Sequence, residues 1–292
     1  MTAATRYHMA LGLLLLPYLL GTLALVVLPL ALTVPLAFTE YNGLAPPVWA
    51  GLGPLRELLH DQLFTTAAQN TLQYTALLVP LRVATALGLA LLLSRRSGLG
   101  LYRAAVYVPT VVPGVAYALI WLWVLNPLYG PLNGLLALLG LPAPAWLADP
   151  RTALPALVLA ALFQLGESFV VLLTGLSAIP RDYYQVAALD GAGRWQVFRQ
   201  ITLPLLAPWL LLVAMRELIT SVQSSFTPAL LMTGGGPYYA TLFLPQLIYQ
   251  TAFDRLRFGQ AAAMTLINML GVALVLLLIY RAFGGWGYDD EV

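Results

Sequence analysis

The chain has 292 residues, of which 60% are hydrophobic and only 9% charged, and its net charge is +2. Soluble domains carry about a quarter charged residues, so the composition excludes an ordinary soluble fold. The absence of cysteine excludes disulfides, thiolate nucleophiles and cysteine-ligated metals. The charge is also too small and too scattered to indicate nucleic acid as a partner.

Six apolar segments are each long enough to cross a bilayer, which takes about 20 residues. They run over residues 9–38, 70–93, 104–125, 153–176, 203–232 and 259–283. The first follows Arg6, as a signal peptide would, but its apolar core is too long for one and we expect it to be retained. The pattern lacks the alternation of a transmembrane barrel. We therefore expect an all-α polytopic membrane protein with six transmembrane helices in a single domain, 1–292.

Loop charges predict the orientation. The loop over 94–103 contains Arg95, Arg96 and Arg103 and no acidic residue, whereas the loop over 39–69 contains three acidic residues and one arginine. The positive-inside rule then places the 94–103 loop and both termini in the cytoplasm. The mildly basic loop around Asp254 runs against this assignment, but it is a single loop.

Two loops on the other side carry turn signals. The connector over 127–150 is rich in glycine and proline, and we expect a short amphipathic helix at 132–139 within it. In "LMTGGGPYY" (231–239), three glycines before Pro237 must end the fifth segment. This break is either a simple extracellular turn or a contact for an external binding protein.

A polar interruption over 180–204 separates the fourth and fifth segments. Asp182 is placed to cap a helix that ends at Leu189, and Gly191 and Gly193 then permit a sharp turn.

A second helical piece over 194–201 follows that turn and places Trp195 and Phe198 on one face. Pro204 marks the return to the membrane. The sequence thus predicts a cytoplasmic helix–turn–helix, which we call the elbow, of a shape that fits a groove on another protein.

Polar faces inside the fourth and fifth segments predict a solute site, because ionisable residues in a membrane usually face the bundle interior or a water-filled cavity. The candidate binding residues are Gln164, Glu167, Ser168, Glu217, Thr220, Ser221 and Ser224. Their carboxylates, amides and hydroxyls suit the hydroxyl groups of a sugar, and Tyr117 or Trp121 could stack on its ring.

Three alternatives stay open at this site. Arg216 could pair with Glu167 across spans and hold the bundle together. Arg82 is either structural or faces a partner, and Trp121 and Trp123 could be packing aromatics rather than sugar platforms.

The energy source must lie outside this chain. All fourteen basic residues are arginine, and a nucleotide-binding P-loop needs a lysine. If transport runs uphill, a partner subunit must bind ATP and Mg²⁺, and this chain holds no cofactor. The elbow is then the handle through which force enters.

The chain resembles the permeases of bacterial ABC importers. The "DGA" at 190–192, the phenylalanine six residues later and "ITLP" (201–204) are similar to the coupling loop of that family, and most similar to its carbohydrate-uptake branch. Further similar segments follow in order: "FTEYNG" (38–43), "NPLYGPLN" (126–133), "LSAIPRDYYQ" (176–185), "LMTGGGP" (231–237) and "AFDRLRFGQAAA" (252–263).

The resemblance implies a type I ABC importer permease fold in the cytoplasmic (inner) membrane. Its implied partners are a second permease subunit in a heterodimer, a dimer of ATP-binding subunits, an extracytoplasmic solute-binding protein, membrane lipid and a sugar substrate. The residues implied to couple to the ATPase are Gln185, Ala187, Ala188, Asp190, Gly191, Ala192, Gly193, Arg194, Trp195, Phe198 and Pro204. Gln185 departs from the glutamate usual in the family, which weakens a charge-assisted contact there.

A di- or oligosaccharide is the expected solute. Glycerol phosphate is the alternative, disfavoured because the two carboxylates of the predicted site would repel a phosphate ester. A self-contained secondary transporter and a membrane enzyme are remote alternatives. Neither an inverted repeat nor a spacing typical of catalytic residues is evident in the sequence.

Overall fold

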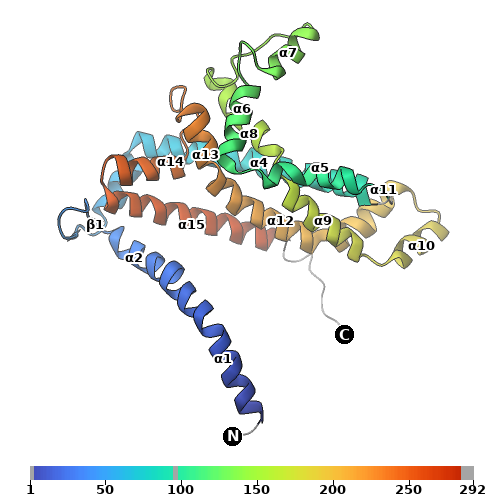
Figure 1. The fold of residues 1–292 in the computed structure, drawn as a ribbon, viewed down its shortest axis with the longest axis horizontal. Helices are drawn as coiled ribbons and strands as arrows, with labels where there is room; N and C mark the ends of the chain where they lie inside the picture. The colour runs from blue at the N-terminus through green and yellow to red at the C-terminus, as the bar shows by residue number, and fades with distance from the viewer. Residues whose placement is uncertain (1–2, 95–97, 284–292) are drawn as a thin grey trace. The chain divides into compact units, whose positions relative to one another are not determined.

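The structure is a computed structural model that describes residues 3–94 and 98–283, and it is almost entirely helical (Figure 1). Arg95 and Arg96, on which the predicted orientation partly rests, lie outside the described residues. The contacts divide the chain into two compact units, Met1–Asp61 with Ile248–Met269 and Gln62–Leu247 with Leu270–Val292. The expected single permease domain over 1–292 stays a prediction.

The first unit begins with a long apolar helix formed by α1 (Ala3–Thr22), a π-helical turn η1 (Leu23–Val27) and α2 (Leu28–Leu36). Two short strands follow, β1 (Thr39–Glu40) and β2 (Val48–Trp49), which pair antiparallel with Thr39 opposite Trp49. The remaining elements of this unit are α3 (Gly53–His60), the end of α14 (Leu244–Tyr249), the π-helical turn η4 (Gln250–Asp254) and the first part of α15 (Phe258–Phe283).

The second unit holds the helices between these segments. Its elements are α4 (Gln62–Ser94), α5 (Gly100–Val111), α6 (Gly114–Val124), α7 (Pro131–Leu138), α8 (Pro150–Leu162), α9 (Gly166–Ala178), α10 (Arg181–Leu189), α11 (Arg194–Val197), η2 (Phe198–Thr202), α12 (Leu203–Ser224), α13 (Phe226–Pro228), η3 (Ala229–Thr233), the first part of α14 (Leu244–Tyr249) and the last part of α15. The predicted short helix at 132–139 corresponds to α7.

Among the described residues, four helices are long and apolar enough to span a membrane, and two bent pairs raise the number to six. The pairs are α5 with α6, bent by 101°, and α8 with α9, bent by 50°. This confirms the polytopic helical class. The third and fourth spans are nevertheless broken helices rather than the single helices that the apolar runs indicate.

The break in the third span has a local cause. Val112 precedes Pro113, and the proline ring disfavours the helical conformation of the residue before it. Val112 is accordingly extended, with ψ 126°, and Pro113 then caps α6.

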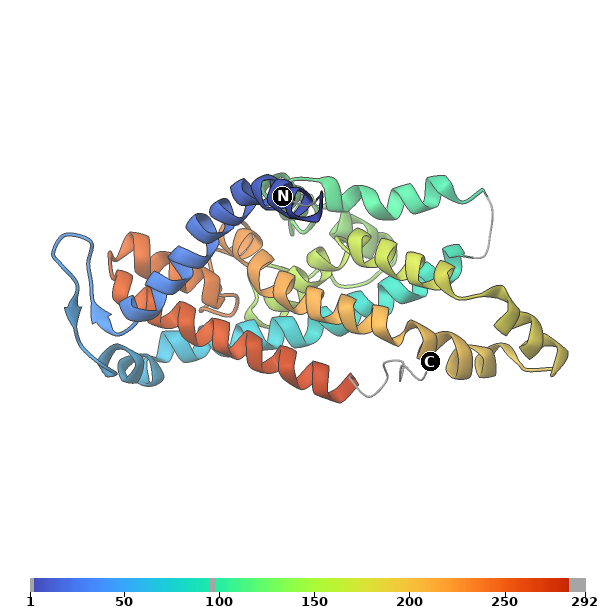
Figure 2. The same cartoon turned by 90° about the horizontal axis from the view of Figure 1, so that it is seen from below.

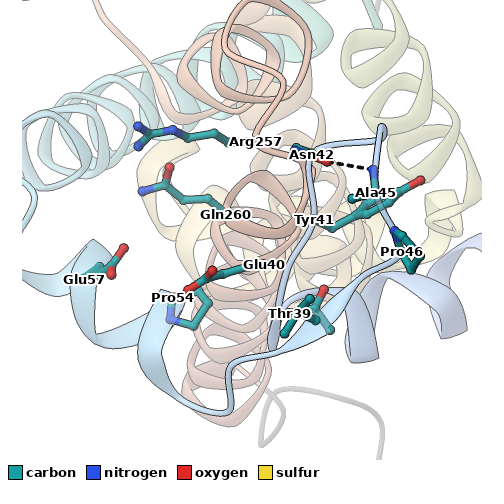
Figure 3. A pocket seen from close by; sticks show the side chains of 11 residues that line it. Thr39, Glu40, Tyr41, Asn42, Ala45, Pro46, Pro54, Glu57, Arg257 and Gln260 are labelled. Carbon is teal, nitrogen blue, oxygen red and sulfur yellow. Dashed lines mark hydrogen bonds between the residues drawn. The ribbon is translucent and has the colours of Figure 1, made fainter.

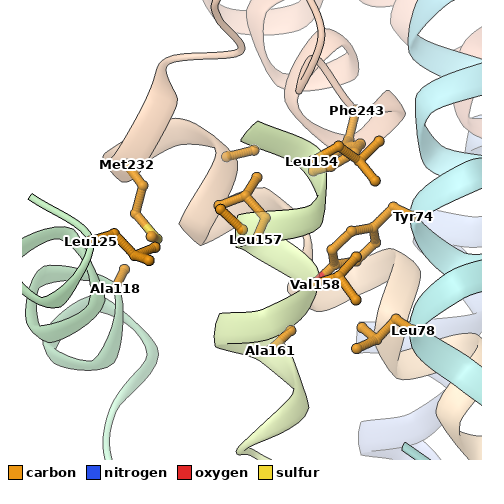
Figure 4. Close-up of a cluster of buried hydrophobic side chains, with 12 residues drawn as sticks. Tyr74, Leu78, Ala118, Leu125, Leu154, Leu157, Val158, Ala161, Met232 and Phe243 are labelled. Atoms are coloured by element: carbon orange, nitrogen blue, oxygen red, sulfur yellow. The ribbon is translucent and has the colours of Figure 1, made fainter. Parts of the chain in front are cut away.

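Among the described residues of the second unit, two apolar clusters contribute to the core. In the first, α8 lies between α4 and α6: Val158 lies on the side of Tyr74, and Leu157 on the side of Ala118 and Met232 (Figure 4). The second cluster joins α4, α9 and α12 around the buried side chains of Ala86, Ala90, Leu165, Phe169, Leu172, Leu206 and Val213. Together they fix α8 and α9 against the surrounding spans.

Candidate functional site

The elbow begins as the sequence predicts but is capped differently. Its first helix, α10, starts after Pro180, and Asp182 lies in the first turn of this helix. No side chain caps the described start of α10, so the predicted cap by Asp182 is wrong. The carboxylate still lies beside the positive end of the helix dipole, where a negative charge is favourable.

The turn of the elbow relies on one glycine rather than two. Gly191 has φ +72°, the left-handed conformation that glycine adopts without strain, and the amide of Ala192 donates to the carbonyl of Ala187 at 2.9 Å. Gly193 has φ −69° and forms the N-cap of α11. A residue other than glycine could adopt that conformation.

The second arm of the elbow runs into the fifth span without interruption. One continuous helix extends from Arg194 to Thr233, and the π-helical turn η2 within it ends at Thr202, two residues before Pro204. The helix is not interrupted at Pro204, which lies at the start of α12, and the return to the membrane at this residue stays a prediction. A rigid lever thus joins the elbow to the membrane segment.

The elbow projects beyond the ends of α4 and α9 (Figures 1 and 2). Several of its apolar side chains are exposed. Trp195 is 72% exposed and stacks near Phe198, with 5.5 Å between the ring centroids, and Leu189 is 88% exposed. This confirms that Trp195 and Phe198 share one face. The hydroxyls of Tyr184 and Thr202, 3.2 Å apart, tie the first arm to the second.

Two hollows flank the elbow. One, of about 630 Å³, is lined by residues that include Ser94, Arg181, Ala188 and Arg194. The other, of about 690 Å³, is lined on the opposite flank by Asp182, Asp190 and Gln196 among others. The predicted coupling residues are mostly exposed here, including Gln185, whereas Ala187 is buried between the arms.

A buried charge cluster connects three spans of the second unit. Arg82 of α4 donates to Glu217 of α12 at 2.9 Å, and both side chains are buried. Ser168 of α9 donates to the other carboxylate oxygen of Glu217. Glu217, predicted to bind solute, is thus fully engaged with protein partners.

Arg216 extends this cluster toward the surface. It pairs with Glu167 of α9, and its guanidinium also lies 3.3 Å from Glu217. The alternative in which Arg216 joins Glu167 across spans is therefore the one that the structure adopts. Arg82 likewise has structural partners.

The break in the fourth span is bonded by side chains from its neighbours. The carbonyl of Ala160 accepts from the Tyr117 hydroxyl at 2.7 Å, and that of Ala161 accepts from Arg82 at 3.0 and 2.5 Å. On the other side of the break, the amide of Gly166 donates to the Thr110 hydroxyl at 2.9 Å. Helix ends leave such backbone groups without intrahelical partners, and in a membrane they must be satisfied internally.

A cavity of about 110 Å³ lies beside this break. Its lining combines polar and aromatic side chains with apolar ones: Tyr74, Arg82, Gly114, Tyr117, Ala118, Trp121, Leu157, Ala160, Ala161, Gln164, Ser224, Thr227, Pro228 and Met232. The Tyr74 hydroxyl is buried and has no hydrogen-bond partner among the residues that the structure describes. A buried polar group in this condition is costly unless a ligand or water meets it.

Only part of the predicted solute site lies at this cavity. Gln164 and Ser224 line it, and so do the aromatic candidates Tyr117 and Trp121. Sequence reasoning missed Tyr74 and Thr227, although Thr227 follows Ser224 at the i+3 spacing that marks one helix face.

The other candidates bond within the protein. Ser168 binds Glu217, Ser221 donates to the Leu218 carbonyl at 2.8 Å, and Thr220 donates to the Arg216 carbonyl at 3.0 Å. Glu167 is occupied by Arg216. Whether any of them contacts solute stays a prediction.

A second cavity, of about 470 Å³, lies within the first unit and was not predicted. It forms where the "FTEYNG" and "AFDRLRFGQAAA" segments meet, because the amide of Gly259 donates to the Tyr41 carbonyl at 3.1 Å. Glu40, Glu57, Arg257 and Gln260 surround the space (Figure 3). Both segments resemble the permease family, and that shared resemblance was the available signal.

Comparison with known proteins identifies the family to which this architecture belongs. Residues 82–284 match the family described as binding-protein-dependent transport system inner membrane component. The chain is 32% identical to the probable ABC transporter permease protein YesP of Bacillus subtilis, over 94% of this chain and 90% of that protein. It is 31% identical to the trehalose/maltose transport system permease protein MalF of Thermococcus litoralis, over 99% of both chains.

A solved structure agrees with the fold. A chain of a bacterial alginate ABC transporter, crystallised with an alginate pentasaccharide-bound periplasmic protein, superposes with a TM-score of 0.82 at 22% identity, over 95% of both chains. The architecture is that of an ABC importer permease, a multi-pass membrane transport subunit rather than an enzyme. The chain belongs to the family of binding-protein-dependent transport system inner membrane components.

Proposed function

We propose that this chain is one permease half of an importer that carries a sugar, most simply a di- or oligosaccharide, into the cell. A relative that aligns over nearly the whole chain is the trehalose/maltose transport system permease protein. The observation that carries the proposal is the cavity beside the fourth-span break, with its amide, hydroxyls and aromatic rings.

The chemistry of this cavity suits a sugar. The Gln164 amide can both donate and accept, and the Tyr74 hydroxyl is buried and unbonded among the described residues. Trp121 offers a flat aromatic face and stands with its ring centroid 5.3 Å from that of Phe163. Sugar rings are bound by such a pairing of hydrogen-bonding groups with aromatic faces.

The size of the cavity supports a second permease subunit as partner. About 110 Å³ is well below the roughly 300–1,000 Å³ of complete ligand pockets. One chain therefore supplies part of the site, and a partner permease completes it.

The charged groups at the cavity indicate whether the solute is neutral or anionic. The expectation of an uncharged solute rested on Glu167 and Glu217, but in the described part of the chain neither carboxylate lines the cavity. Arg82 does line it, and its charge is balanced by Glu217. A balanced arginine favours a neutral sugar over glycerol phosphate.

The elbow is the proposed docking element for a separate ATP-binding subunit, which would hold the ATP and Mg²⁺. Its exposed Trp195 is of a residue type enriched at interface hot spots, and Leu189 adds exposed apolar surface. In this arrangement the elbow and both termini are cytoplasmic, and a solute-binding protein delivers sugar on the opposite side. ATP-driven closure of the ATPase pair would draw the coupling loops together and expose the cavity outward.

The test is sugar uptake by the complete transporter reconstituted in vesicles, with trehalose, maltose and glycerol 3-phosphate as candidate solutes. Tyr74→Phe removes one hydroxyl and should raise the apparent KM for the imported sugar about three- to tenfold, the effect of one hydrogen bond. Tyr280→Phe, at an exposed position on α15, is the matched control. Unchanged KM in Tyr74→Phe, or uptake of glycerol 3-phosphate alone, would refute the sugar site.

A further inference from the structure

The break in the fourth span is held by side chains from four helices of the second unit. Arg82 comes from α4, Thr110 from α5, Tyr117 from α6 and Glu217 from α12. Arg82, Thr110 and Tyr117 bond the backbone at the break, and Glu217 bonds Ser168 just after it. We call this set of hydrogen-bonded side chains the joint.

Arg82 is the centre of this joint because it bonds one side of the break directly and reaches the other side through Glu217. Its Nε and Nη2 atoms donate to the Ala161 carbonyl at the end of α8, and its Nη1 atom donates to Glu217. Glu217 in turn accepts from Ser168 in the first turn of α9. One guanidinium thus links the last turn of α8 to the first turn of α9.

The two sides of the joint lead to the two functional ends of the unit. Leu157, Ala160 and Ala161 of α8 and Gln164 in the break line the cavity. Ala178, the last residue of α9, is separated from α10 of the elbow by Ile179 and Pro180. A change in the bend at the break therefore alters the distance between the elbow and the cavity wall.

We propose that Arg82, Glu217 and Ser168 are positioning residues that set the bend of the fourth span and transmit movement of the elbow to the cavity, rather than ligands of the solute. The inference rests on the proposed transport function, because it assumes that the elbow is the driven element. It assigns to Glu217 a role different from the solute contact that its position on a polar helix face predicts.

The geometry makes this joint sensitive to small changes. Gly166 approaches α5 so closely that a Cβ there would lie 2.5 Å from the Thr110 hydroxyl and 2.9 Å from the Tyr107 Cα atom. Arg82 and Glu217 are both buried, so removing Glu217 leaves the charge of Arg82 uncompensated, whereas Glu217 without Arg82 keeps only Arg216 at 3.3 Å. Packed polar junctions of this kind switch between discrete arrangements rather than deforming smoothly.

The experiment measures the bend and the coupling separately. The chain lacks cysteine, so Arg151→Cys in α8 and Val170→Cys in α9, both exposed, carry spin labels whose separation reports the bend in the full transporter. With the joint intact, the distribution of distances between the two labels is narrow and shifts when ATP is trapped. In Glu217→Gln, it broadens and the ATP hydrolysed per sugar imported rises about tenfold, within the range of coupling between sites.

Ser168→Ala keeps the charges of Arg82 and Glu217 and replaces Glu217→Gln as the test variant if that variant fails to insert. It should broaden the distances and raise the ATP hydrolysed per sugar in the same direction, by a smaller amount. Thr174→Ala, whose hydroxyl bonds only within α9 among the described residues, is the control and should change neither readout.

The outcomes separate this joint from the sugar proposal. A raised KM with unchanged distances and unchanged ATP per sugar would make Glu217 a solute ligand and overturn the joint. Broadened distances with unchanged coupling would reduce the cluster to a structural brace and also overturn it. Broadened distances and ATP hydrolysis uncoupled from whichever solute is carried would support the joint even if that solute is not a sugar.

Discussion

The Arg82 guanidinium lies 2.9 Å from the Glu217 carboxylate, although the two residues stand 135 positions apart on α4 and α12. Their side chains are only 5% and 1% exposed. Desolvation largely offsets the attraction of such a pair, so its net contribution to stability is small. Removing one partner is different, because the other is left buried and charged.

Arg82→Met should therefore lower the free energy of unfolding by about 3 kcal/mol, the lower end of the range for breaking a buried pair. The lower end applies because Arg216 still lies 3.3 Å from Glu217. The double variant Arg82→Met/Glu217→Met should recover most of the loss. Thermal unfolding in detergent measures both, and equal losses in the single and double variants would contradict an uncompensated charge as the cause.

Gly166→Ala should destabilise the protein by about 1–3 kcal/mol, the usual cost of overpacking. The new methyl group meets the backbone of Tyr107 and the Thr110 hydroxyl that accepts from the Gly166 amide. Gly88→Ala on α4, where the described residues leave the methyl free space, is the control and should be neutral or stabilising. The same unfolding assay compares them, and equal stability of the two variants would show that the approach of α9 to α5 is looser than described.

Trp195→Ala should weaken binding of the ATP-binding subunit by about 2 kcal/mol or more, the size typical of an interface hot spot. Trp49→Ala is the matched control, since Trp49 is similarly exposed and stacks on Phe38 at 5.8 Å. Titration of the ATPase subunit against the purified permease pair gives both affinities. A larger effect at Trp49 would place the docking surface elsewhere.

Trp121→Ala should raise the KM for sugar about fivefold or more, since an aromatic platform is commonly worth at least 1 kcal/mol. Trp123→Ala is the comparison, because Trp123 lies two positions away on α6 and is 57% exposed. Uptake kinetics decide between them. Equal effects would mean that Trp121 acts through packing.

The helical class, the elbow and its glycine turn were predictable because each rests on a local signal. Apolar length marks a span, and the "DGAG" stretch needs the left-handed turn at Gly191. The family resemblance, carried by several motifs in order, supplied the importer architecture that local signals alone could not.

The partners of Glu217 were not predictable in the same way. A carboxylate on a polar helix face looks alike whether it meets solute or an arginine on another span. Nothing in the sequence around Arg82 indicates that it pairs with Glu217, 135 positions away, and the break before Gly166 has no proline to mark it. Long-range contacts decide both features, and a single sequence holds no record of them.

The central claim is that a chain without its own nucleotide site is driven through the elbow. Because the chain has no cysteine, Leu189→Cys at the elbow and Leu128→Cys after α6, 88% and 87% exposed, can be compared by cross-linking in the complete transporter. The account predicts that Leu189→Cys cross-links to the ATP-binding subunit and Leu128→Cys does not. Cross-linking at Leu128→Cys alone, or at neither position in a transporter that imports sugar, would contradict it.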